Sequence, residues 1–567
     1  MLDERPSNDR EAATTALAQA AIEWWRGAVV YQIYPRSFAD SNDDGTGDLP
    51  GLIGKLDYIA ALGVDAIWIS PFYRSPMADF GYDISDYREV DPVFGTLADF
   101  DRLVAESHRR GLRVIVDQVL NHSSDQHPWF IESRQSRDNP KANWYVWADP
   151  QPDGTPPNNW LSIFGGSAWQ WEPRRGQYYL HNFLASQPDL NYHEPQVAAQ
   201  MLQEAEFWLQ HGVDGFRLDA INFCFHDAAL RSNPPKPVHE RKGRGYTVDN
   251  PYAAQYHLYD NTQPQTLQFL ERLRAVMDRY PGSMTLGEIS CEDPFAALHE
   301  YTLAGRRLNS AYCFELLVER FSTAHVREVL QTLAVRAPDY WPCWAVGNHD
   351  VARVVSRWAC PGVDAPQRAK LFNAFLLALR GTVCTYQGEE LGLTEAEVPR
   401  EALRDPYGVA FWPTFKGRDG CRTPFPWSST DPQAGFTRGQ PWLPVAAEHR
   451  AAAASVQQRD AESVLHAYKS MIRFRRSHPA LVGGALSLLE SDDPLFAFVR
   501  EGFGERLLVV LNFGAAEASF RIPPAMRVEA LTGHGFAACA VTDGRIHLPA
   551  AGAFFGSIRA TGKGDPC

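Results

Sequence analysis

Charged side chains lie at the ends of several short apolar runs in this sequence. Arg217 and Asp219 are two residues apart in one run, so their side chains point to the same side of a strand. Glu288 ends a second run, and His349 and Asp350 end a third. Because burying a lone charge is costly, such groups need partners or a chemical task. Taken alone, the Arg217–Asp219 pair is explained equally well as a structural ion pair.

Together these residues predict a site with three carboxylates and two imidazoles. His122, which follows the run Arg113–Val119, supplies the second imidazole. Cleaving an acetal requires such a set, because one carboxylate attacks or steadies the cationic centre while a second, with a raised pKa, protonates the leaving oxygen. A third carboxylate and the histidines can hold sugar hydroxyls in a distorted ring. The pattern therefore favours a sugar-cleaving enzyme.

The elements that must position these residues are strands alternating with helical patterns, which is typical of a parallel α/β fold. Eight strands are expected: Val29–Tyr34, Val64–Ser70, Arg113–Val119, Gly215–Ala220, Met284–Ile289, Ala311–Leu316, Trp344–Val346 and Thr382–Tyr386. Periodicity alone also permits a doubly wound sheet. The polar residues gather at the carboxyl ends of the strands, where barrel enzymes build their sites, so the sequence favours a (β/α)8 TIM barrel.

Two long segments interrupt the barrel pattern. Residues 122–192 are rich in Trp, Pro, Gly and Asn and too long for a barrel loop, so we expect a small inserted domain after strand three. A second insertion, Phe225–Gln263, follows strand four. From about Leu481 the pattern alternates with period two, which predicts a C-terminal β-sandwich over 481–567. Residues 23–121 and 193–480 then form the catalytic barrel, and 1–22 a flexible N-terminal extension.

A candidate metal loop lies just after the first strand, with the order DxNxDGxGD. Five of its residues could offer oxygen ligands: Asp40, Asn42, Asp44, Thr46 and Asp48. Gly45 permits the sharp turn of a calcium loop, although no helix-borne glutamate follows. A plain acidic loop is the alternative. The ligand order favours a metal, and we expect a structural Ca²⁺, or Mg²⁺ in its place, away from the chemistry.

Composition excludes several classes of function. The 567 residues include 68 acidic and 54 basic side chains, and a net charge of −14 argues against binding nucleic acid or an anionic membrane. The nine cysteines form no CxxC pair or Cys/His cluster, so neither a zinc site nor a disulfide framework is predicted. No apolar run has membrane-spanning length and the N-terminus lacks a signal-peptide pattern. We expect a cytoplasmic monomer or homodimer acting on a small molecule.

Four motifs in this order resemble the α-amylase family of glycoside hydrolases. They are DxVxNH at 117–122, GFRxDA at 215–220, GE at 287–288 and NHD at 348–350. Within the family, the α-glucosidase and oligo-1,6-glucosidase branch is the most similar. Its marks are YPRSF at 34–38, QPDLN at 187–191, QGEE at 387–390 and KGRD at 416–419. The similarity spans nearly the whole chain from Trp24, and the segment from Asn222 to Pro264 resembles bacterial α-glucosidases noted for glucosyl transfer.

The resemblance implies a role for each residue that matches a motif. Asp219 would be the nucleophile, Glu288 the general acid/base and Asp350 a third carboxylate that grips sugar hydroxyls. Arg217 would orient Asp219. This set implies retention through a covalent β-glucosyl–enzyme intermediate, which water or another hydroxyl acceptor then intercepts.

The resemblance also implies a binding pocket for one glucose. His122 and His349 would hydrogen-bond the sugar, and Tyr82 would be its stacking platform. Asp79 and Arg418 would close the pocket behind the non-reducing end. An exo-acting enzyme on maltose and other short α-glucosides is therefore expected, with glucosyl transfer to hydroxyl acceptors.

Linkage preference depends on the residue after the proposed nucleophile. Relatives that act on α-1,6 bonds resemble one another in having Val there, whereas this chain has Ala220, which favours α-1,4 bonds. An α-1,6-specific oligoglucosidase or a sucrose isomerase is the alternative. A non-catalytic glucosidase-like transporter subunit is disfavoured, because it would carry a transmembrane helix and lack the three carboxylates.

Overall fold

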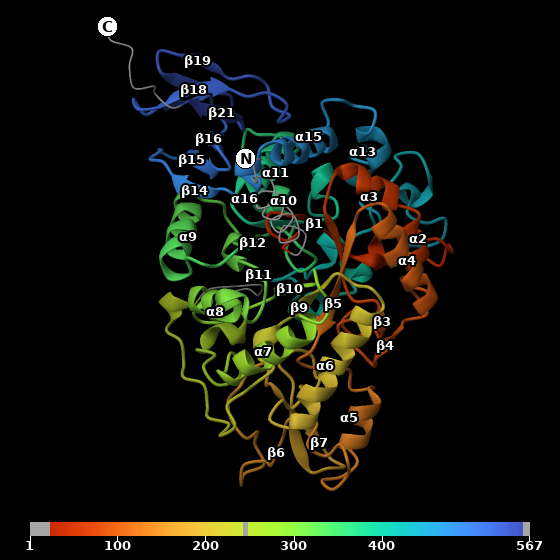
Figure 1. Cartoon of the computed structure of the whole chain (residues 1–567). Helices are drawn as coiled ribbons and strands as arrows, with labels where there is room; N and C mark the ends of the chain where they lie inside the picture. The colour runs from red at the N-terminus through yellow and green to blue at the C-terminus, as the bar shows by residue number, and fades with distance from the viewer. Residues whose placement is uncertain (1–22, 242–247, 560–567) are drawn as a thin grey trace, which may run out of the picture.

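Eight parallel strands form one closed sheet at the centre of the computed structural model, which describes residues 23–241 and 248–559 (Figure 1). The strands are β1 (Val29–Ile33), β2 (Ala66–Ile69), β5 (Arg113–Val119), β9 (Gly215–Asp219), β10 (Met284–Gly287), β11 (Ser310–Ala311), β12 (Cys343–Trp344) and β13 (Thr382–Tyr386). Their order is β11-β10-β9-β5-β2-β1-β13-β12. A parallel bridge between Tyr312 and Cys343 joins β11 to β12. The predicted (β/α)8 TIM barrel is confirmed.

The sixth and seventh strands are shorter than the sequence predicts. The ladder of β11 ends at Ala311, and Phe314–Leu316 form a 3-10 helix instead of continuing the predicted strand. The seventh strand, β12, is two residues long and ends at Trp344. Leu316 is buried in the helix as it would be in a strand. An apolar run therefore indicated burial correctly, but it cannot distinguish a buried strand from a buried turn.

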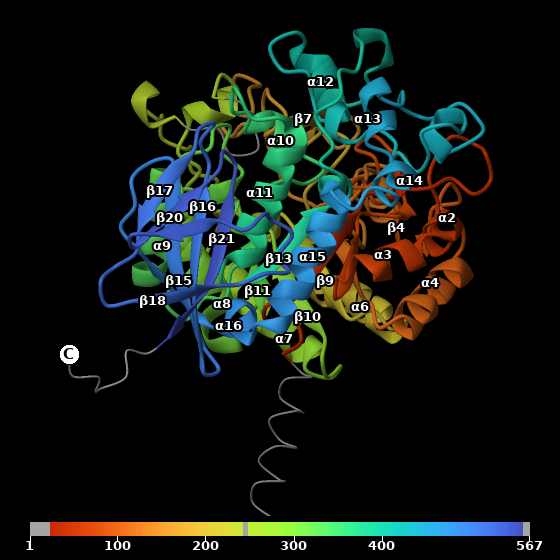
Figure 2. The same cartoon turned by 90° about the horizontal axis from the view of Figure 1, so that it is seen from above.

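Helices cover the outside of the barrel, as the view from above shows (Figure 2). The longer ones are α3 (Leu56–Leu62), α4 (Leu97–Arg109), α6 (Pro195–Gln210), α7 (Gln265–Met277), α8 (Pro294–Thr302), α9 (Thr323–Arg336), α11 (Ala365–Ala378) and α15 (Val464–Ser477). The others are α2 (Leu49–Ile53), α5 (Pro128–Ser133), α10 (Val354–Arg357), α12 (Pro406–Phe411), α13 (Ala447–Ala451), α14 (Ala454–Gln457) and α16 (Pro479–Gly483).

Local sequence explains where these helices begin and which face they bury. Thr96 and Asp99 form a reciprocal capping box at the start of α4, which satisfies two backbone N–H groups. Phe100, Leu103 and Val104 then lie on the buried face of that helix. Spacing by three and four residues places such side chains on one side of a helix, so the apolar stripe packs on the sheet.

The segment between β5 and α6 forms a separate small unit with α5 and a three-stranded antiparallel sheet. Its strands are β6 (Trp147–Ala148), β7 (Trp169–Glu172) and β8 (Gln177–Leu180), in the order β6-β8-β7. Trp160 and Trp169 stack in its core. A short hairpin of β3 (Tyr73–Arg74) and β4 (Asp86–Val90) follows β2. The bridge between His122 and Asp189 ties the two ends of the inserted segment together at the barrel rim.

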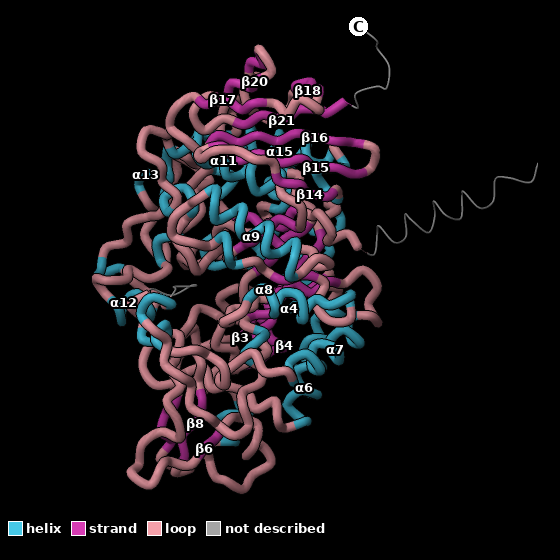
Figure 3. Tube along the Cα trace, turned by 90° about the vertical axis from the view of Figure 1, so that its left-hand side faces the viewer, coloured by secondary structure: helices cyan, strands magenta, loops and turns pink. Residues whose placement is uncertain are grey.

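The C-terminal part consists of two antiparallel sheets. The first has the order β14-β15-β16-β21-β18 and the second β17-β20-β19. The strands are β14 (Ala485–Leu488), β15 (Leu495–Gly502), β16 (Glu505–Asn512), β17 (Ala518–Arg521), β18 (Arg527–Ala530), β19 (Ala540–Thr542), β20 (Arg545–Leu548) and β21 (Ala553–Arg559). Phe520 and Ile546 of one sheet pack with Val510 of the other. Figure 3 places these sheets and the β6–β8 unit at opposite ends of the molecule.

The structure does not test the predicted domain boundaries, which stay predictions. Leu481 lies in α16, and the first C-terminal strand begins at Ala485. The predicted extension 1–22 lies outside the described residues. None of the helices in the described part of the chain combines the length and hydropathy needed to cross a bilayer.

Candidate active site

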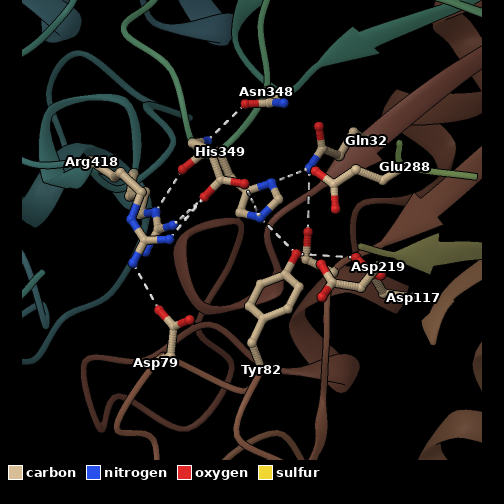
Figure 4. Close-up of polar contacts among 12 residues, drawn as sticks. Gln32, Asp79, Tyr82, Asp117, Asp219, Glu288, Asn348, His349 and Arg418 are labelled. Carbon is tan, nitrogen blue, oxygen red and sulfur yellow. Dashed lines mark hydrogen bonds and ion pairs between the residues drawn. The ribbon is translucent and has the colours of Figure 1, made fainter. Parts of the chain in front are cut away.

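Three carboxylates, Asp117, Asp219 and Glu288, lie near one another at the carboxyl ends of β5, β9 and β10 (Figure 4), and all three contact the buried guanidinium of Arg217. Arg217 Nη1 lies 2.8 Å from Asp117 Oδ1 and 2.6 Å from Asp219 Oδ1. Arg217 Nη2 lies 2.7 Å from Glu288 Oε2. Register explains the convergence, because Asp117 pairs with Arg217 across β5 and β9, and Gly287 pairs with Leu218 across β10 and β9. Arg217 therefore holds three acidic side chains together.

The backbone after Asp219 turns sharply and adds a further contact to Glu288. Ala220 has left-handed dihedrals, with φ 38° and ψ 44°, and begins the 3-10 helix Ile221–Phe223. Its N–H donates to Glu288 Oε2 at 3.0 Å. L-residues other than Asn and Asp rarely adopt this conformation, and β-branched residues least of all. The turn therefore constrains the carboxyl of Glu288 through the backbone and also restricts which residue fits at 220.

Burial and charge separate the pKa values of the carboxyl groups. Burial raises the pKa of Glu288 to about 8, although Arg217 acts in the opposite direction. Burial also raises the pKa of Asp219, to about 7, with Arg217 again lowering it. One guanidinium cannot compensate three buried charges, so a proton is retained within the group. Glu288, with the highest value, is the carboxyl that holds this proton longest as pH rises.

The pKa of Asp350 is lowered, whereas those of Asp219 and Glu288 are raised. Burial would raise the pKa of Asp350, but its contact with His349 and the positive charges of Arg418 and Arg422 outweigh burial and hold the pKa well below its usual range. Arg422 Nη2 donates to Asp350 Oδ1 at 2.8 Å, and Arg418 Nη1 donates to the same oxygen at 3.1 Å. Asp350 is therefore an anion at every physiological pH.

A chain of polar contacts links Tyr82 and His349 behind these carboxylates. The hydroxyl of Tyr82 donates to Asp117 Oδ2 at 3.1 Å and lies 2.6 Å from His349 Nε2. His349 Nδ1 lies 2.7 Å from the amide nitrogen of Gln32, which can only donate. Nε2 of His349 therefore carries the ring proton. The phenol of Tyr82 and this imidazole are thus held in place beside the carboxylates by hydrogen bonds (Figure 4).

Asp79 and Arg418, the two residues expected behind the non-reducing end, form an ion pair. Arg418 Nη2 donates to Asp79 Oδ1 at 2.8 Å, while its Nη1 reaches Asp350. The structure adds Asp405, which lies 2.8 Å from the same Nη2. Sequence reasoning missed Asp405, because it lies in an irregular segment 13 residues before Arg418 and belongs to no motif. Without it, one guanidinium would be shared by two carboxylates only.

His122 approaches the same pocket from the inserted segment. Its Nε2 lies 3.1 Å from the carbonyl oxygen of Tyr82 and 3.1 Å from Gln187 Nε2. Gln187 also donates to Asp79 Oδ2 at 3.2 Å. Burial lowers the pKa of His122 to about 4, so its imidazole is neutral at physiological pH. Gln187 entered the sequence reasoning only as part of a motif, and the structure places it at the pocket.

These side chains line a cavity of about 90 Å³. Seven of the nine predicted catalytic and binding residues contribute to its wall: Asp79, Tyr82, His122, Asp219, Glu288, Asp350 and Arg418. Arg217 and His349, the other two, lie behind the wall and contact its residues. The wall combines charged oxygens, neutral donors and the rings of Phe164 and Phe183. Such a mixture is suited to a small ligand that carries many hydroxyl groups on an apolar frame.

None of the residues in the predicted metal loop lines this cavity. Asp40 Oδ1 accepts from the N–H groups of Asn42 and Asp43, and Asp44 Oδ1 accepts from Thr46 N–H at 2.8 Å. Asp48 Oδ1 accepts from Gly51 N–H at 2.6 Å and so caps α2. Within residues 23–241 and 248–559, no three His, Cys, Asp or Glu side chains gather as a metal cluster. The loop does present oxygen donors of the kind that Ca²⁺ prefers.

Known proteins resemble this chain over nearly its whole length. The family described as "Alpha amylase, catalytic domain" matches residues 32–484. A probable alpha-glucosidase of Rhizobium meliloti is 53% identical over 96% of this chain and 99% of its own length. An oligo-1,6-glucosidase of Parageobacillus thermoglucosidasius is 38% identical over 88% of this chain and 92% of its own.

A solved structure has the same fold and many of the same residues. The crystal structure of the alpha-glucosyl transfer enzyme XgtA superimposes with a TM-score of 0.93 at 58% identity, covering 94% of this chain and 99% of XgtA. Three observations indicate the same family: the carboxylates at the barrel rim, the closed eight-stranded sheet and the similarity to these known proteins. The chain belongs to the α-amylase family of glycoside hydrolases.

Proposed function

We propose that this enzyme is a retaining, exo-acting α-glucosidase that cleaves α-1,4-linked glucose from maltose and short α-glucosides. The observation that carries the proposal is the binding of Asp219 and Glu288 to the two Nη atoms of Arg217, at 2.6 and 2.7 Å. Sharing one guanidinium keeps the two carboxyl groups close. Retaining enzymes need a separation of about 5–5.5 Å, whereas inverting enzymes need about 6.5–9.5 Å to admit a water molecule.

In the first step, Asp219 attacks the anomeric carbon of the terminal glucose. Arg217 holds its oxygen and favours the ionised form that attacks. Glu288 donates its proton to the glycosidic oxygen as the bond to the leaving group breaks. The high pKa of Glu288 suits it to this role, because the group stays protonated up to about pH 8.

In the second step, a hydroxyl compound releases the glucose from Asp219. Glu288, now ionised, accepts the proton of the incoming hydroxyl. The hydroxyl oxygen bonds to the anomeric carbon as the bond between that carbon and Asp219 breaks. Water gives hydrolysis, and another alcohol gives glucosyl transfer. Asp350, held as an anion by Arg418 and Arg422, would bind sugar hydroxyls through both steps.

The buried ion pair of Asp79 and Arg418 supports exo-action. Both residues line the cavity, and Asp405 bonds to the same Nη2 of Arg418 as Asp79 does. A longer chain extending past the terminal glucose would have to break this buried pair. We therefore propose that the enzyme binds one glucose at this end and removes units from the non-reducing terminus.

Substrate comparison tests this proposal directly. We expect kcat/KM for maltose to exceed that for isomaltose by about 10-fold, because a methyl-scale misfit at the leaving sugar is worth about 1–3 kcal/mol. Starch should lose its iodine staining only slowly. An enzyme that prefers isomaltose or rearranges sucrose would support the alternatives, and rapid loss of iodine staining would contradict exo-action.

The pH profile should report the proton on Glu288. With maltose, kcat/KM should fall above about pH 8, because ionised Glu288 cannot protonate the leaving oxygen. With p-nitrophenyl α-glucoside, whose leaving group needs less protonation, the alkaline fall should be shallower. Measuring both substrates across pH 5–10 on one preparation checks the assignment. Identical alkaline limbs for the two substrates would contradict a general-acid role.

We also propose that the loop from Asp40 to Asp48 binds a structural Ca²⁺, or Mg²⁺ in its place. Its carboxylate and amide oxygens alternate along a tight turn, which suits a hard cation. The backbone N–H of Trp442 donates to the carbonyl oxygen of Gly45, and the backbone N–H of Arg438 donates to Asp43 Oδ1. These bonds join the loop to a distant segment. A cation there would stabilise that connection without entering the reaction.

Chelation tests the metal proposal. EDTA should lower Tm by about 2 °C or more, because a ligand that binds only the folded state stabilises it by about 2.7 kcal/mol at 100 times its Kd. Added Ca²⁺ should restore Tm, whereas kcat at a temperature well below Tm should change little. Asp44→Ala is the control and should abolish the response to both additions. An unchanged Tm in EDTA with the wild-type enzyme would rule the cation out.

We propose small α-glucosides and hydroxyl acceptors as the partners of this enzyme, and a reducing compartment such as the cytoplasm as its location. No disulfide joins the cysteines in the described residues, and Cys567 lies outside them. Stable disulfides are rare in reducing compartments, which agrees with that location. A monomer or a homodimer stays the prediction for the oligomeric state.

A further inference from the structure

The loop from Ser75 to Asp83 lies between the hairpin strands β3 and β4 and carries two residues that line the proposed glucose pocket, Asp79 and Tyr82. We call residues 75–83 the pocket loop. Asp79 accepts a hydrogen bond from Arg418 at 2.8 Å, and the two side chains face each other in Figure 4. The conformation of the pocket loop therefore decides where the carboxylate of Asp79 lies.

The backbone of the pocket loop is strained on both sides of Asp79. Three of its residues have a positive φ: Met77 at 64°, Phe80 at 51° and Gly81 at 110°. Glycine adopts such angles readily, but Met and Phe rarely do. Strained conformations persist only where the surrounding structure holds them in place. The segment that carries Asp79 must therefore be held by bonds from outside its own backbone.

Asp83 supplies such bonds from the end of the pocket loop. Its side chain is fully buried. Oδ1 of Asp83 accepts from the hydroxyl of Ser75 at 2.9 Å and from the backbone N–H of Asp79 at 2.9 Å. Oδ2 accepts from the backbone N–H of Ala78 at 2.8 Å. One carboxylate thus ties the start of the pocket loop to Asp79 and to the residue before it.

The charge of Asp83 suits this task better than a neutral group would. Burial raises the pKa of Asp83 to about 6, and the hydrogen bonds from the N–H groups of Asp79 and Ala78 oppose the rise. The side chain is therefore an anion at neutral pH and presents an acceptor to each of its three donors. An amide could not do so, because its nitrogen only donates. Hydrogen bonds to an ionised acceptor are also stronger than those to a neutral one.

Asp79 keeps acceptor capacity for a ligand. Its Oδ1 accepts from Arg418, and its Oδ2 accepts from Gln187 at 3.2 Å. An ionised carboxylate offers about four acceptor sites, so sites remain for a sugar hydroxyl. Asp79, Gln187 and Arg418 all line the pocket, whereas Asp83 does not. Any influence of Asp83 on a ligand must therefore pass through Asp79.

We infer that Asp83 is a positioning residue that sets specificity at the non-reducing end of the substrate. It holds the carboxylate of Asp79 where this group accepts a hydrogen bond from the 4-hydroxyl of the terminal glucose, the point at which a longer α-1,4 chain would continue. This inference rests on the proposed α-glucosidase function and adds to it a residue outside the pocket wall. Without the bonds from Asp83, the strained backbone beside Asp79 would relax and carry the carboxylate away from that hydroxyl.

Two substrates that differ in one hydroxyl test the inference. They are p-nitrophenyl α-glucoside and its 4-deoxy analogue. In the wild-type enzyme, kcat/KM should be about 100-fold higher for the glucoside, because the analogue leaves the buried carboxylate of Asp79 without its partner. Asp83→Asn should lower kcat/KM for the glucoside about 10-fold and hardly change that for the analogue, so the ratio falls to about 10. An unchanged ratio in Asp83→Asn would overturn the inference.

The matched control is Asp91→Asn. Asp91 Oδ2 also bonds to the start of the pocket loop, accepting from Ser75 N–H at 3.1 Å, but Asp91 makes no bond to Asp79. This variant should keep the wild-type ratio, and an equal loss in both variants would contradict a specific role for Asp83. If Asp83→Asn does not fold, Ser75→Ala replaces it. Removing that hydroxyl takes away one of the three bonds and should lower the ratio about threefold, whereas the wild-type ratio in Ser75→Ala would overturn the inference.

The two proposals fail in different ways. If the wild-type enzyme hydrolyses no α-glucoside, the proposed function is wrong. If it hydrolyses p-nitrophenyl α-glucoside but cleaves the 4-deoxy analogue equally well, or keeps its discrimination in Asp83→Asn, only the role of Asp83 is wrong.

Discussion

Replacing Asp219 with alanine is expected to lower kcat for p-nitrophenyl α-glucoside by about 10⁴-fold or more, the loss seen when one member of a concerted catalytic set is removed. Without this carboxylate no covalent intermediate forms. Arg217 keeps Asp117 and Glu288 as partners, so the variant should still fold. Azide added to the variant should attack the anomeric carbon directly and yield a β-glucosyl azide, because the space left by Asp219 admits a small anion.

The control for this experiment is Asp57→Ala. Asp57 is an exposed carboxylate paired with Arg110 on the outside of the barrel, and its side chain is 87% exposed. This change should leave kcat within twofold. Near wild-type turnover by purified Asp219→Ala, or an azide product of α configuration, would sink the nucleophile assignment.

Replacing Glu288 with alanine is expected to lower kcat/KM for maltose by about 10²–10⁴-fold, the usual contribution of general acid catalysis. The loss should be smaller for p-nitrophenyl α-glucoside, whose leaving group departs without a proton. The second step would then be slow, because nothing activates water. Azide needs no base, so it should accelerate release and yield an α-glucosyl azide.

The opposite configurations of the two azide products distinguish the roles of Asp219 and Glu288 in a way that activity loss cannot. A Glu288→Gln variant provides the check on structure, since it keeps the shape of the side chain and can still accept from Ala220 N–H. It should melt near the wild-type Tm while losing activity toward maltose. A β-glucosyl azide from Glu288→Ala would contradict a general acid/base role and retention together.

Much of the barrel was predictable because most of its strands are specified by their own local sequence. Arg113–Val119 and Thr382–Tyr386 were predicted with the bounds that the structure shows, since long apolar runs followed by helical patterns specify buried strands. The bounds of β11 and β12 were not predicted correctly, because a two-residue ladder depends on the neighbouring strands rather than on its own sequence. The bridge from Tyr312 to Cys343 that closes the ring has no signature in either segment.

The candidate site was also predictable from the sequence only in part. The ends of β9 and β10 could be predicted to meet, because the carboxyl ends of parallel strands share one rim. That Arg217 contacts Glu288 as well as Asp219 depends on the register between these strands, which only the structure shows. Asp405 and Gln187 reach the pocket from irregular segments, where no periodicity links sequence to position. The left-handed turn at Ala220 gave no sequence signal, since alanine rarely adopts it.

The unequal strand lengths around the barrel have a consequence for how the enzyme can change. Strands β5 and β9 are paired along five residues and carry Asp117, Arg217 and Asp219, whereas β11 pairs with β10 through only two. Phe314 and Leu317 follow β11, outside any ladder, and line a cavity that Glu288 also lines. Mutations, insertions and deletions there break few backbone hydrogen bonds, so this segment can accumulate variation while the longer ladder between β5 and β9 keeps its charged residues in place. Directed evolution toward new acceptors should therefore draw its libraries from residues 312–318 first.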